Sequence, residues 1–406
     1  MVRTTPFHPR LKDFDETGLF THWQGHLSSL RYQPSVRHEY FAVRAAVGVF
    51  DASPLLKYRV RGPQAVEALA SLLARDVRRC AVGRAQYTVW CDDDGHVLED
   101  GVVFRHGEDD LLLTAARPNL GWLRTHLAGY DAEVSDVSDD FGVLAVQGVR
   151  SREVLAALSP DVAALRYFAL AHTAIAGVEV VVSRTVYTGD LGYELLVPAD
   201  GALTVLDAVL AEGAGRAIRP FGEDALMMLR LEAGLPLLDV DFSSARFAWT
   251  PNQRFTPTEL GLGRMVGLDD DRAFVGRAAL RRERASGSAR WATVGLLVDP
   301  AEHRDRYREA GLPPSFDEGA RAAESMLYDG AGDPATAEPI GYTTTRGWSP
   351  MLQRHVALAR VRPPYAAAGT RLQLETTIDH SYRSIGVDVA PLPLFDPPRR
   401  TAASDS

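Results

Sequence analysis

The chain has 406 residues and a formal net charge of −9, from 44 basic and 53 acidic side chains. This length exceeds what one compact core usually fills, so the sequence predicts two or three domains. With 46% hydrophobic and 24% charged residues, the composition is that of a globular protein. The acidic balance, without any block of basic residues, argues against sequence-independent binding of nucleic acid.

Several classes of site are disfavoured by residue usage. Lys12 and Lys57 are the only lysines, and neither follows the glycine run of a phosphate-binding loop. Cys80 and Cys91 have neither metal-type spacing nor a disulfide framework, which favours a reducing cytoplasm. The sequence contains no apolar stretch of roughly 20 residues and no secretion-type apolar core near its start. We therefore expect a cytoplasmic protein with no metal site and no membrane association.

The first two thirds of the chain predict mixed helices and strands. Helical spacing predicts a helix at Glu39–Val49. Strands and helices then alternate at Leu55–Val60, Gln64–Leu73, Tyr87–Cys91, Val97–Arg105, Leu111–Ala115 and Leu120–Leu127. A second mixed segment follows at Gly142–Gln147, Arg152–Leu158, Val178–Tyr187, Leu195–Val197, Ala202–Ala211 and Glu223–Glu232. This order favours antiparallel sheets backed by helices.

The last third predicts short strands. A polar linker at Arg284–Arg290 precedes them. The predicted strands are Trp291–Val298, Ser325–Tyr328, Gly341–Thr345, His355–Val361 and Arg371–Thr376. The charged segment Glu302–Ala323 is predicted to be an exposed insertion, and the Pro-rich residues 391–406 a flexible tail.

Two adjacent carboxylates interrupt an apolar strand. Glu99 and Asp100 lie within Val97–Phe104, whose other side chains are mostly aliphatic or aromatic. A carboxylate there is costly unless it faces solvent or has partners, so a strand-edge turn and a functional site are equally compatible with the pattern. Successive strand residues point to opposite faces, so only one of the two carboxylates can line a given pocket.

Two further polar features stand out. The run Tyr187–Glu194 (YTGDLGYE) is compatible with an exposed hairpin, and also with a turn that points Glu194 into a pocket. Arg230 lies in an apolar helical stretch, where a buried guanidinium needs a carboxylate partner or an anionic ligand. Spacing alone leaves both pairs of alternatives open.

Seven pieces of sequence, taken in order, resemble the folate-dependent aminomethyltransferase family, whose founding member is the T-protein of the glycine cleavage system. These pieces are FDAS at 50–53, GHVLEDGV at 95–102, AVQG at 145–148, YTGDLGYE at 187–194, LRLEAG at 229–234, FVGRAAL at 274–280, and the stretch Gly341–Val361. Each piece is short, and the order of all seven makes the resemblance specific.

The resemblance implies tetrahydrofolate as the cofactor, and a set of site residues. Asp100 matches the family's catalytic aspartate, and Glu194 matches the glutamate that hydrogen-bonds the pterin ring. Tyr87, Tyr187 and Arg230 match further positions of the folate pocket. A carboxylate can accept N–H groups from a pterin edge, an arginine suits the anionic tail of folate, and tyrosines offer a stacking surface.

The resemblance also implies an α+β fold with three lobes around a central folate channel. The first folate-binding domain would be discontinuous, formed by residues 1–53 and 138–284. An α+β domain at 54–137 would be inserted into it and would carry Asp100. A β-barrel-like domain would follow at 290–390.

Two segments depart from the T-protein pattern. Leu112–Leu120 (LLTAARPNL) stands where T-proteins have an asparagine soon after a strand, and Leu235–Phe242 (LPLLDVDF) stands where they read "LYGQE" or similar. The first of these segments and the later run Glu259–Gly263 (ELGLG) are more similar to relatives that demethylate small molecules. The sequence therefore favours a tetrahydrofolate-dependent demethylase, which moves a methyl group from a methoxylated or methylated small molecule to N5.

Two alternatives stay open. The first is a glycine-cleavage-type aminomethyltransferase, with a lipoyl carrier protein as donor and 5,10-methylenetetrahydrofolate as product. The second is a non-catalytic folate-binding scaffold. The motifs do not specify the donor, and the candidates for contacting it are His22, Trp23, Tyr32, Phe247 and Trp249.

Overall fold

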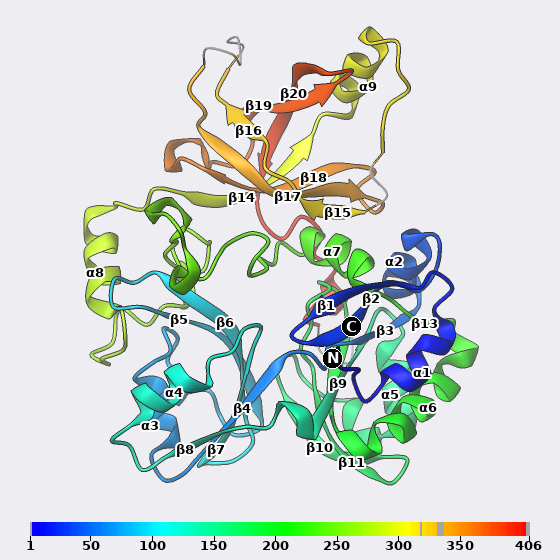
Figure 1. Cartoon of the computed structure of the whole chain (residues 1–406), viewed down its shortest axis with the longest axis vertical. Helices are drawn as coiled ribbons and strands as arrows, with labels where there is room; N and C mark the ends of the chain where they lie inside the picture. Colours follow the sequence, from blue (N-terminus) through cyan, green and yellow to red (C-terminus); the bar gives the residue numbers. More distant parts are fainter. Residues whose placement is uncertain (1, 317–318, 331–336, 403–406) are drawn as a thin grey trace.

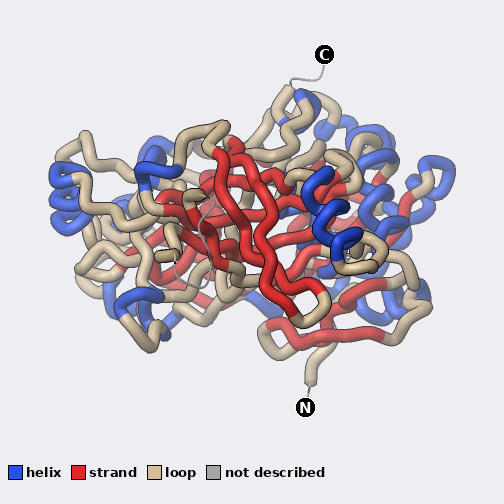
Figure 2. The backbone as a smooth tube through the Cα atoms, turned by 90° about the horizontal axis from the view of Figure 1, so that it is seen from above, coloured by secondary structure: helices blue, strands red, loops and turns tan. Residues whose placement is uncertain are grey.

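The computed structural model describes residues 2–316, 319–330 and 337–402. Two mixed sheet-and-helix units lie side by side beneath a third unit made mostly of strands (Figure 1). Seen from above, the strands gather in the middle and most helices lie toward the two sides (Figure 2). The predicted α+β fold is confirmed. No α-helix in the described ranges is both long and apolar enough to span a membrane.

A five-stranded sheet is formed by one continuous stretch of chain. Its strand order is β5-β6-β7-β4-β8. The strands are β4 (Leu56–Arg61), β5 (Arg84–Cys91), β6 (Val97–Arg105), β7 (Asp110–Ala115) and β8 (Glu133–Asp136). Helices α3 (Ala65–Ala70) and α4 (Leu120–Leu127) bury Leu69 and Leu123 in the apolar cluster on this sheet.

A six-stranded sheet combines strands from both sides of that stretch, in the order β10-β11-β12-β9-β3-β13. The strands are β3 (Val47–Asp51), β9 (Phe141–Gln147), β10 (Leu170–Ile175), β11 (Val178–Ser183), β12 (Gly192–Pro198) and β13 (Ile218–Pro220). Only the short β13–β3 pair within this sheet is parallel. The predicted helix Glu39–Val49 is wrong in its last residues. The helix ends at Ala45, and Val47 and Val49 are buried residues of strand β3.

Helices cover both faces of this sheet. Leu144 and Val146 of β9 pack in the cluster with α5 (Ser151–Leu158) and α6 (Ala202–Gly213). Val143 and Ala145 point to the other face, in the cluster with α2 (Val36–Ala45) and α7 (Glu223–Glu232). This alternation is the period of two that a strand imposes on its side chains. The hairpin β1 (Leu19–Trp23) and β2 (His26–Arg31) and the short helix α1 (His8–Leu11) lie beside this unit.

The third unit contains a closed barrel of six strands, which confirms the predicted β-barrel-like domain and adds one strand, Ser381–Ala390, to the five strands predicted there. Its strands are β14 (Ala292–Val298), β16 (Met326–Tyr328), β17 (Gly341–Ser349), β18 (Arg354–Val361), β19 (Arg371–Ile378) and β20 (Ser381–Ala390). The β17–β18 pairing closes the ring, and β15 (Ala320–Ala322) adds to β17. Helix α8 (Arg277–Ser286) precedes the barrel and replaces the first part of the predicted linker.

Most described residues of the predicted insertion Glu302–Ala323 are exposed or half-buried, as expected, but its first part is helical; residues 317–318 lie outside the described ranges. Helix α9 (Pro300–Glu309) begins after Asp299, whose side chain accepts the N–H groups of Ala301 and Glu302. Glu302 accepts the N–H of Gly386 in β20 at 2.7 Å, which ties the helix to the barrel. Helix capping and this contact order a segment whose charge predicts exposure.

Residues 391–402 also differ from the predicted flexible tail. The chain leaves the barrel and runs down to the lower two units (Figure 1). Leu392 and Leu394 pack on the α2–α7 cluster, and Arg399 binds Asp190 through two contacts of 2.6 and 2.8 Å. Buried partners far away in sequence therefore hold this segment. Residues 403–406 lie outside the described ranges.

Candidate active site

A cavity of about 950 Å³ opens between the two lower sheets. One wall comes from β5, β6 and β7, and the facing wall comes from β9, β11 and β12. The β1–β2 hairpin, α7 with the segment after it, and the chain after β20 also contribute to the lining. This volume falls within the range of sites that bury a ligand of drug size.

Asp100 and Tyr87 form a hydrogen-bonded pair on the first wall. In the β5–β6 ladder Tyr87 lies opposite Val102, so it is the diagonal neighbour of Asp100 on the same face. The Tyr87 hydroxyl donates to Oδ2 of Asp100 at 2.8 Å. Burial raises the pKa of Asp100 to about 6, while the hydrogen bond from Tyr87 favours the ionised form.

Glu99 points away from the cavity and is fully buried. Its Oε2 accepts the N–H of Arg117 at 2.9 Å and lies 3.4 Å from the Asn119 amide nitrogen. Burial, and then the charge of Asp100, raise the pKa of Glu99 to about 9. Of the pair, Asp100 therefore has the lower pKa and is the carboxyl group that ionises first.

Gly101 fixes the position of Asp100. A Cβ atom at residue 101 would lie 1.9 Å from the carbonyl oxygen of Thr114 in β7. No side chain fits at that distance, so β6 can approach β7 this closely only with glycine. The sequence pattern Asp-Gly within the strand is thus a packing requirement that holds the carboxylate at the cavity wall.

Glu194 lies on the facing wall, in β12, and lines the same cavity. The Thr185 hydroxyl donates to Oε2 of Glu194, and the hydroxyls of Ser183 and Thr185 are 2.7 Å apart. Burial raises the pKa of Glu194, and the Thr185 hydrogen bond opposes this shift. Glu194 therefore faces the cavity as a hydrogen-bonded carboxyl group with a raised pKa.

The loop that precedes Glu194 is held by buried charges. Asp190 is fully buried, and its carboxylate binds Arg44 at 3.1 Å and Arg399 at 2.6 Å. Gly189 has a φ of +70°, and a Cβ there would lie 2.5 Å from the Cβ of Ala233. An exposed hairpin is thus the wrong alternative for this run. Tyr187 lines the cavity and donates to the carbonyl oxygen of Pro236 at 2.9 Å.

Arg230 lies outside the set of described residues that line the cavity. Its guanidinium forms an ion pair with Asp241 at 2.5 Å and donates to Oγ1 of Thr345 in β17 at 2.7 Å. The sequence pattern leaves two possible partners for Arg230, a carboxylate or an anionic ligand. The structure shows the carboxylate of Asp241 as the partner. The structure does not bring Arg230 to the other four site residues, Asp100, Tyr87, Tyr187 and Glu194.

Sequence reasoning missed several polar side chains of the cavity. They are Arg75, Arg117, Gln147, Glu223, Asp239 and Arg400. Arg117 pairs with Asp239 at 2.6 Å, and these two residues come from the two segments that depart from the T-protein pattern. The departures from the T-protein pattern were therefore the sequence signal that could have identified Arg117 and Asp239 as cavity residues, since both segments line the cavity.

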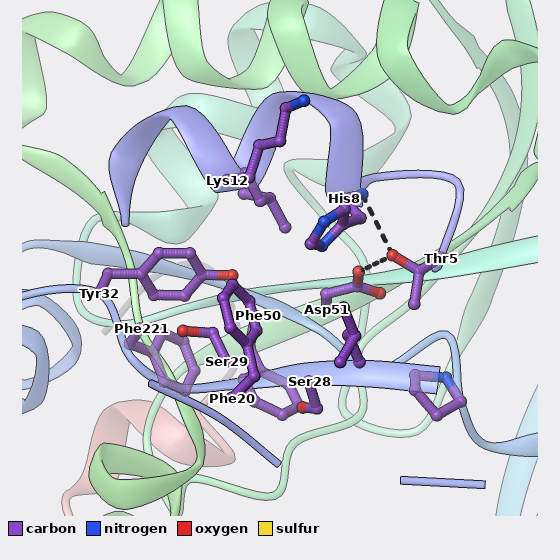
Figure 3. Close-up of a pocket in the computed structure, with 13 residues that line it drawn as sticks. Thr5, His8, Lys12, Phe20, Ser28, Ser29, Tyr32, Phe50, Asp51 and Phe221 are labelled. Atoms are coloured by element: carbon purple, nitrogen blue, oxygen red, sulfur yellow. Dashed lines mark hydrogen bonds between the residues drawn. The ribbon is translucent and has the colours of Figure 1, made fainter. Parts of the chain in front are cut away.

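The donor-contact candidates divide into three groups. His22 and Trp23 line the cavity. Tyr32 lines a separate pocket of about 20 Å³, which shares Phe50 with the large cavity (Figure 3). Phe247 and Trp249 are 56% and 92% exposed on a surface loop.

Metal-binding groups are absent from the described ranges, where no cluster of three His, Cys, Asp or Glu side chains could hold an ion. Cys80 and Cys91 are buried thiols. Burial raises the pKa of both thiols, so neither is an activated nucleophile. The ionisable groups of the cavity are therefore carboxylates, tyrosines, arginines and the two histidines His22 and His106.

The sequence matches two family descriptions. Residues 12–270 match the GCVT N-terminal domain, and residues 310–396 match the glycine cleavage T-protein C-terminal barrel domain. An aminomethyltransferase of Saccharopolyspora erythraea is 34% identical over 399 residues, 97% of this chain and 98% of that protein. An aminomethyltransferase of Streptomyces coelicolor is 37% identical over 348 residues, 84% of this chain and 85% of that protein.

The fold is also similar to a solved structure. The glycine cleavage system aminomethyltransferase T from Bartonella henselae superposes with a TM-score of 0.79 at 23% identity, over 98% of this chain and 99% of that one. Tetrahydrofolate is the one-carbon acceptor of the family that these matches define. From the two domain matches and the relatives above 30% identity, the chain belongs to the glycine cleavage T-protein family.

Proposed function

We propose that this chain transfers a one-carbon unit from an amine-bearing donor to tetrahydrofolate, as an aminomethyltransferase of the glycine cleavage type. The observation that carries the proposal is the convergence of Asp100 and Glu194, from two different sheets, on one cavity. The names of the relatives support it, since the two described above, at 34% and 37% identity, are aminomethyltransferases. The donor would then be carried by a lipoyl protein.

The cavity residues fit tetrahydrofolate. Glu194 and Asp100 offer carboxylate oxygens to the N–H groups of a pterin, and Tyr87 and Tyr187 offer rings and hydroxyls beside them. Arg75 and Arg400 also line the cavity and suit an anionic glutamate tail. They would take the place that the resemblance gives to Arg230.

Asp100 would contribute charge rather than a covalent bond. When bound, tetrahydrofolate supplies the nitrogens N5 and N10, which take the carbon while their two protons pass to the departing sulfur and ammonia of the donor. A fixed carboxylate beside atoms on which positive charge develops is worth about 10²–10³ in rate. The hydrogen bond from Tyr87 and the close approach at Gly101 hold the Asp100 carboxylate in place, so it needs no reorganisation during the reaction.

A demethylase is the second candidate, and one observation favours it. The two segments that depart from the T-protein pattern meet in the cavity through Arg117 and Asp239, where a different donor would be recognised. A free methylated compound would then replace the carrier-bound donor and leave 5-methyltetrahydrofolate.

The product separates these functions. The protein is incubated with tetrahydrofolate and, in turn, an aminomethylated lipoyl carrier, methylated amines and methoxyaromatic acids. Formation of 5,10-methylenetetrahydrofolate from the carrier supports the proposal. Formation of 5-methyltetrahydrofolate from a free compound supports the demethylase instead. Folate binding without either product leaves the scaffold alternative.

A further inference from the structure

One end of the cavity, beside the β1–β2 hairpin, is aromatic and contains a carboxylate. We call it the aromatic compartment, and its lining residues are Trp23, Phe50, Phe221, Glu223, Leu226 and Met227. The ring centroids of Trp23 and Phe50 are 6.3 Å apart, and those of Phe50 and Phe221 are 5.3 Å apart. The three rings therefore pack in a row, with Phe50 5% and Phe221 1% exposed.

One carboxyl oxygen of Glu223 in this compartment, Oε1, is buried and lacks a hydrogen-bond partner among the described residues. Burial raises the pKa of Glu223 and the nearby Ser28 side chain opposes this shift; Ser28 also lines the small pocket shown in Figure 3. No ion pair of Glu223 occurs in the described part of the chain, whereas the adjacent Asp224 binds Arg31 at 2.6 Å.

The position of Glu223 in the first turn of α7 explains only part of this arrangement. A carboxylate near a helix N-terminus gains about 0.3–1 kcal/mol from the helix dipole. Asp224 occupies the same turn and reaches a cation at the surface. The dipole does not require that Glu223 face a cavity with one oxygen unpaired, and a buried carboxylate without a cation is costly.

A carboxylate beside several aromatic rings has the chemistry of an ammonium site. Aromatic faces attract cations, most strongly where water is excluded, and the carboxylate supplies the opposite charge. Methoxyaromatic acids carry a negative charge themselves, so Glu223 would repel them. Asp100 lines the same cavity, so a donor bound in the compartment shares it with the reaction site.

We propose that the aromatic compartment binds the donor through a positively charged alkylammonium group, with Glu223 as its counter-charge and Trp23, Phe50 and Phe221 as its apolar walls. This inference rests on the proposed function in one respect, namely that the donor enters this cavity. It makes the donor a cationic amine rather than a methoxylated acid.

Binding measurements, which need no turnover, test the proposal that the aromatic compartment binds an alkylammonium group. Calorimetry compares choline with its uncharged isostere 3,3-dimethylbutan-1-ol on the full chain. The wild type should bind choline at least about tenfold more tightly than the isostere. Glu223→Gln, which keeps the shape and removes the charge, should reduce this preference to within about twofold. Asp224→Asn, one residue away on the same helix, removes the same charge outside the cavity and should leave the preference intact.

The inference is overturned if the wild type shows no preference for the cation, or if Glu223→Gln keeps it. Thermal melting confirms that each variant is folded. If Glu223→Gln does not fold, Trp23→Leu is the second probe, and it should also weaken choline binding at least threefold. Cation-selective binding without one-carbon transfer from any donor would contradict the proposed function and leave the ammonium site standing.

Discussion

The Tyr87 hydroxyl lies 2.8 Å from Oδ2 of Asp100, across two antiparallel strands that form one wall of the cavity. This contact gives the carboxylate a fixed orientation and favours its ionised form against the effect of burial. The neighbouring Glu99, on the other face of the strand, has the higher pKa and takes the proton first. Of these two neighbouring carboxyl groups, Asp100 is therefore the one that presents a negative charge to the cavity above pH 6.

Activity should fall on acidification. Because burial raises the pKa of Asp100 to about 6, protonation below that pH removes the charge that the reaction uses. We expect kcat/KM to decrease about tenfold for each pH unit well below 6 and to level off above it. The profile is measured with saturating tetrahydrofolate, and a flat profile between about pH 5 and 7 would argue against an essential Asp100 carboxylate.

Glu194→Ala should weaken tetrahydrofolate binding. Loss of a charge-assisted hydrogen bond costs about 1.5–3 kcal/mol, or about tenfold to a hundredfold in Kd. Thr185→Val is the matched variant that tests how much the orientation of Glu194 matters, since it removes only the hydroxyl that donates to Glu194. Calorimetry should show a smaller loss for Thr185→Val, and unchanged affinity in a folded Glu194→Ala protein would remove Glu194 from the folate site.

Arg230→Lys should lower stability more than folate affinity. A lysine cannot reach both Asp241 and Thr345, so it leaves a buried hydrogen-bonding group unsatisfied at a cost of about 1–3 kcal/mol. Thermal denaturation should show a Tm several degrees below that of the wild type. An unchanged Tm together with a large loss of folate affinity would instead support the contact that the family resemblance implies.

Removal of residues 391–406 should damage the site as well as the fold. The deletion removes Phe395 and Arg400 from the cavity wall and leaves the buried Asp190 with Arg44 as its only arginine partner in the described ranges. We expect a lower Tm and weaker tetrahydrofolate binding. Arg399→Met, which removes only the ion pair, should lower Tm with less effect on binding. A truncated protein with wild-type Tm and affinity would show that the segment is dispensable.

The sequence predicts the elements that local patterns encode. Alternation along Val97–Arg105 and the apolar faces of Leu120–Leu127 and Glu223–Glu232 predict the strand and both helices with their observed bounds. Four of the five site residues that the family resemblance names lie on one cavity. These features depend on neighbours in sequence or on short motifs.

The remaining features depend on contacts between distant residues. Val47 and Val49 continue a helical pattern, and only pairing with β9 and β13 makes them a strand. The segment after Pro391 is ordered by Asp190, about 200 residues earlier. Arg230 needs a carboxylate or an anion, and nothing local shows that Asp241, beyond a turn, provides it. Glu223 belongs to none of the sequence motifs, so its place in the cavity and its unpaired oxygen are visible only in the structure.

Turnover by Asp100→Asn and Glu99→Gln tests the central claim most directly. Asparagine keeps the size of the side chain and removes the charge, so Asp100→Asn should lower kcat about 10²–10³-fold. Its Tm at pH 7 should not fall, because the pKa of Asp100 lies above the ordinary 3.8, so folding disfavours the ionised form. Glu99→Gln replaces a buried carboxyl group with raised pKa, outside the cavity lining, with a neutral isostere and should change kcat less than about threefold. Loss of turnover in Glu99→Gln with retention in Asp100→Asn would contradict the account.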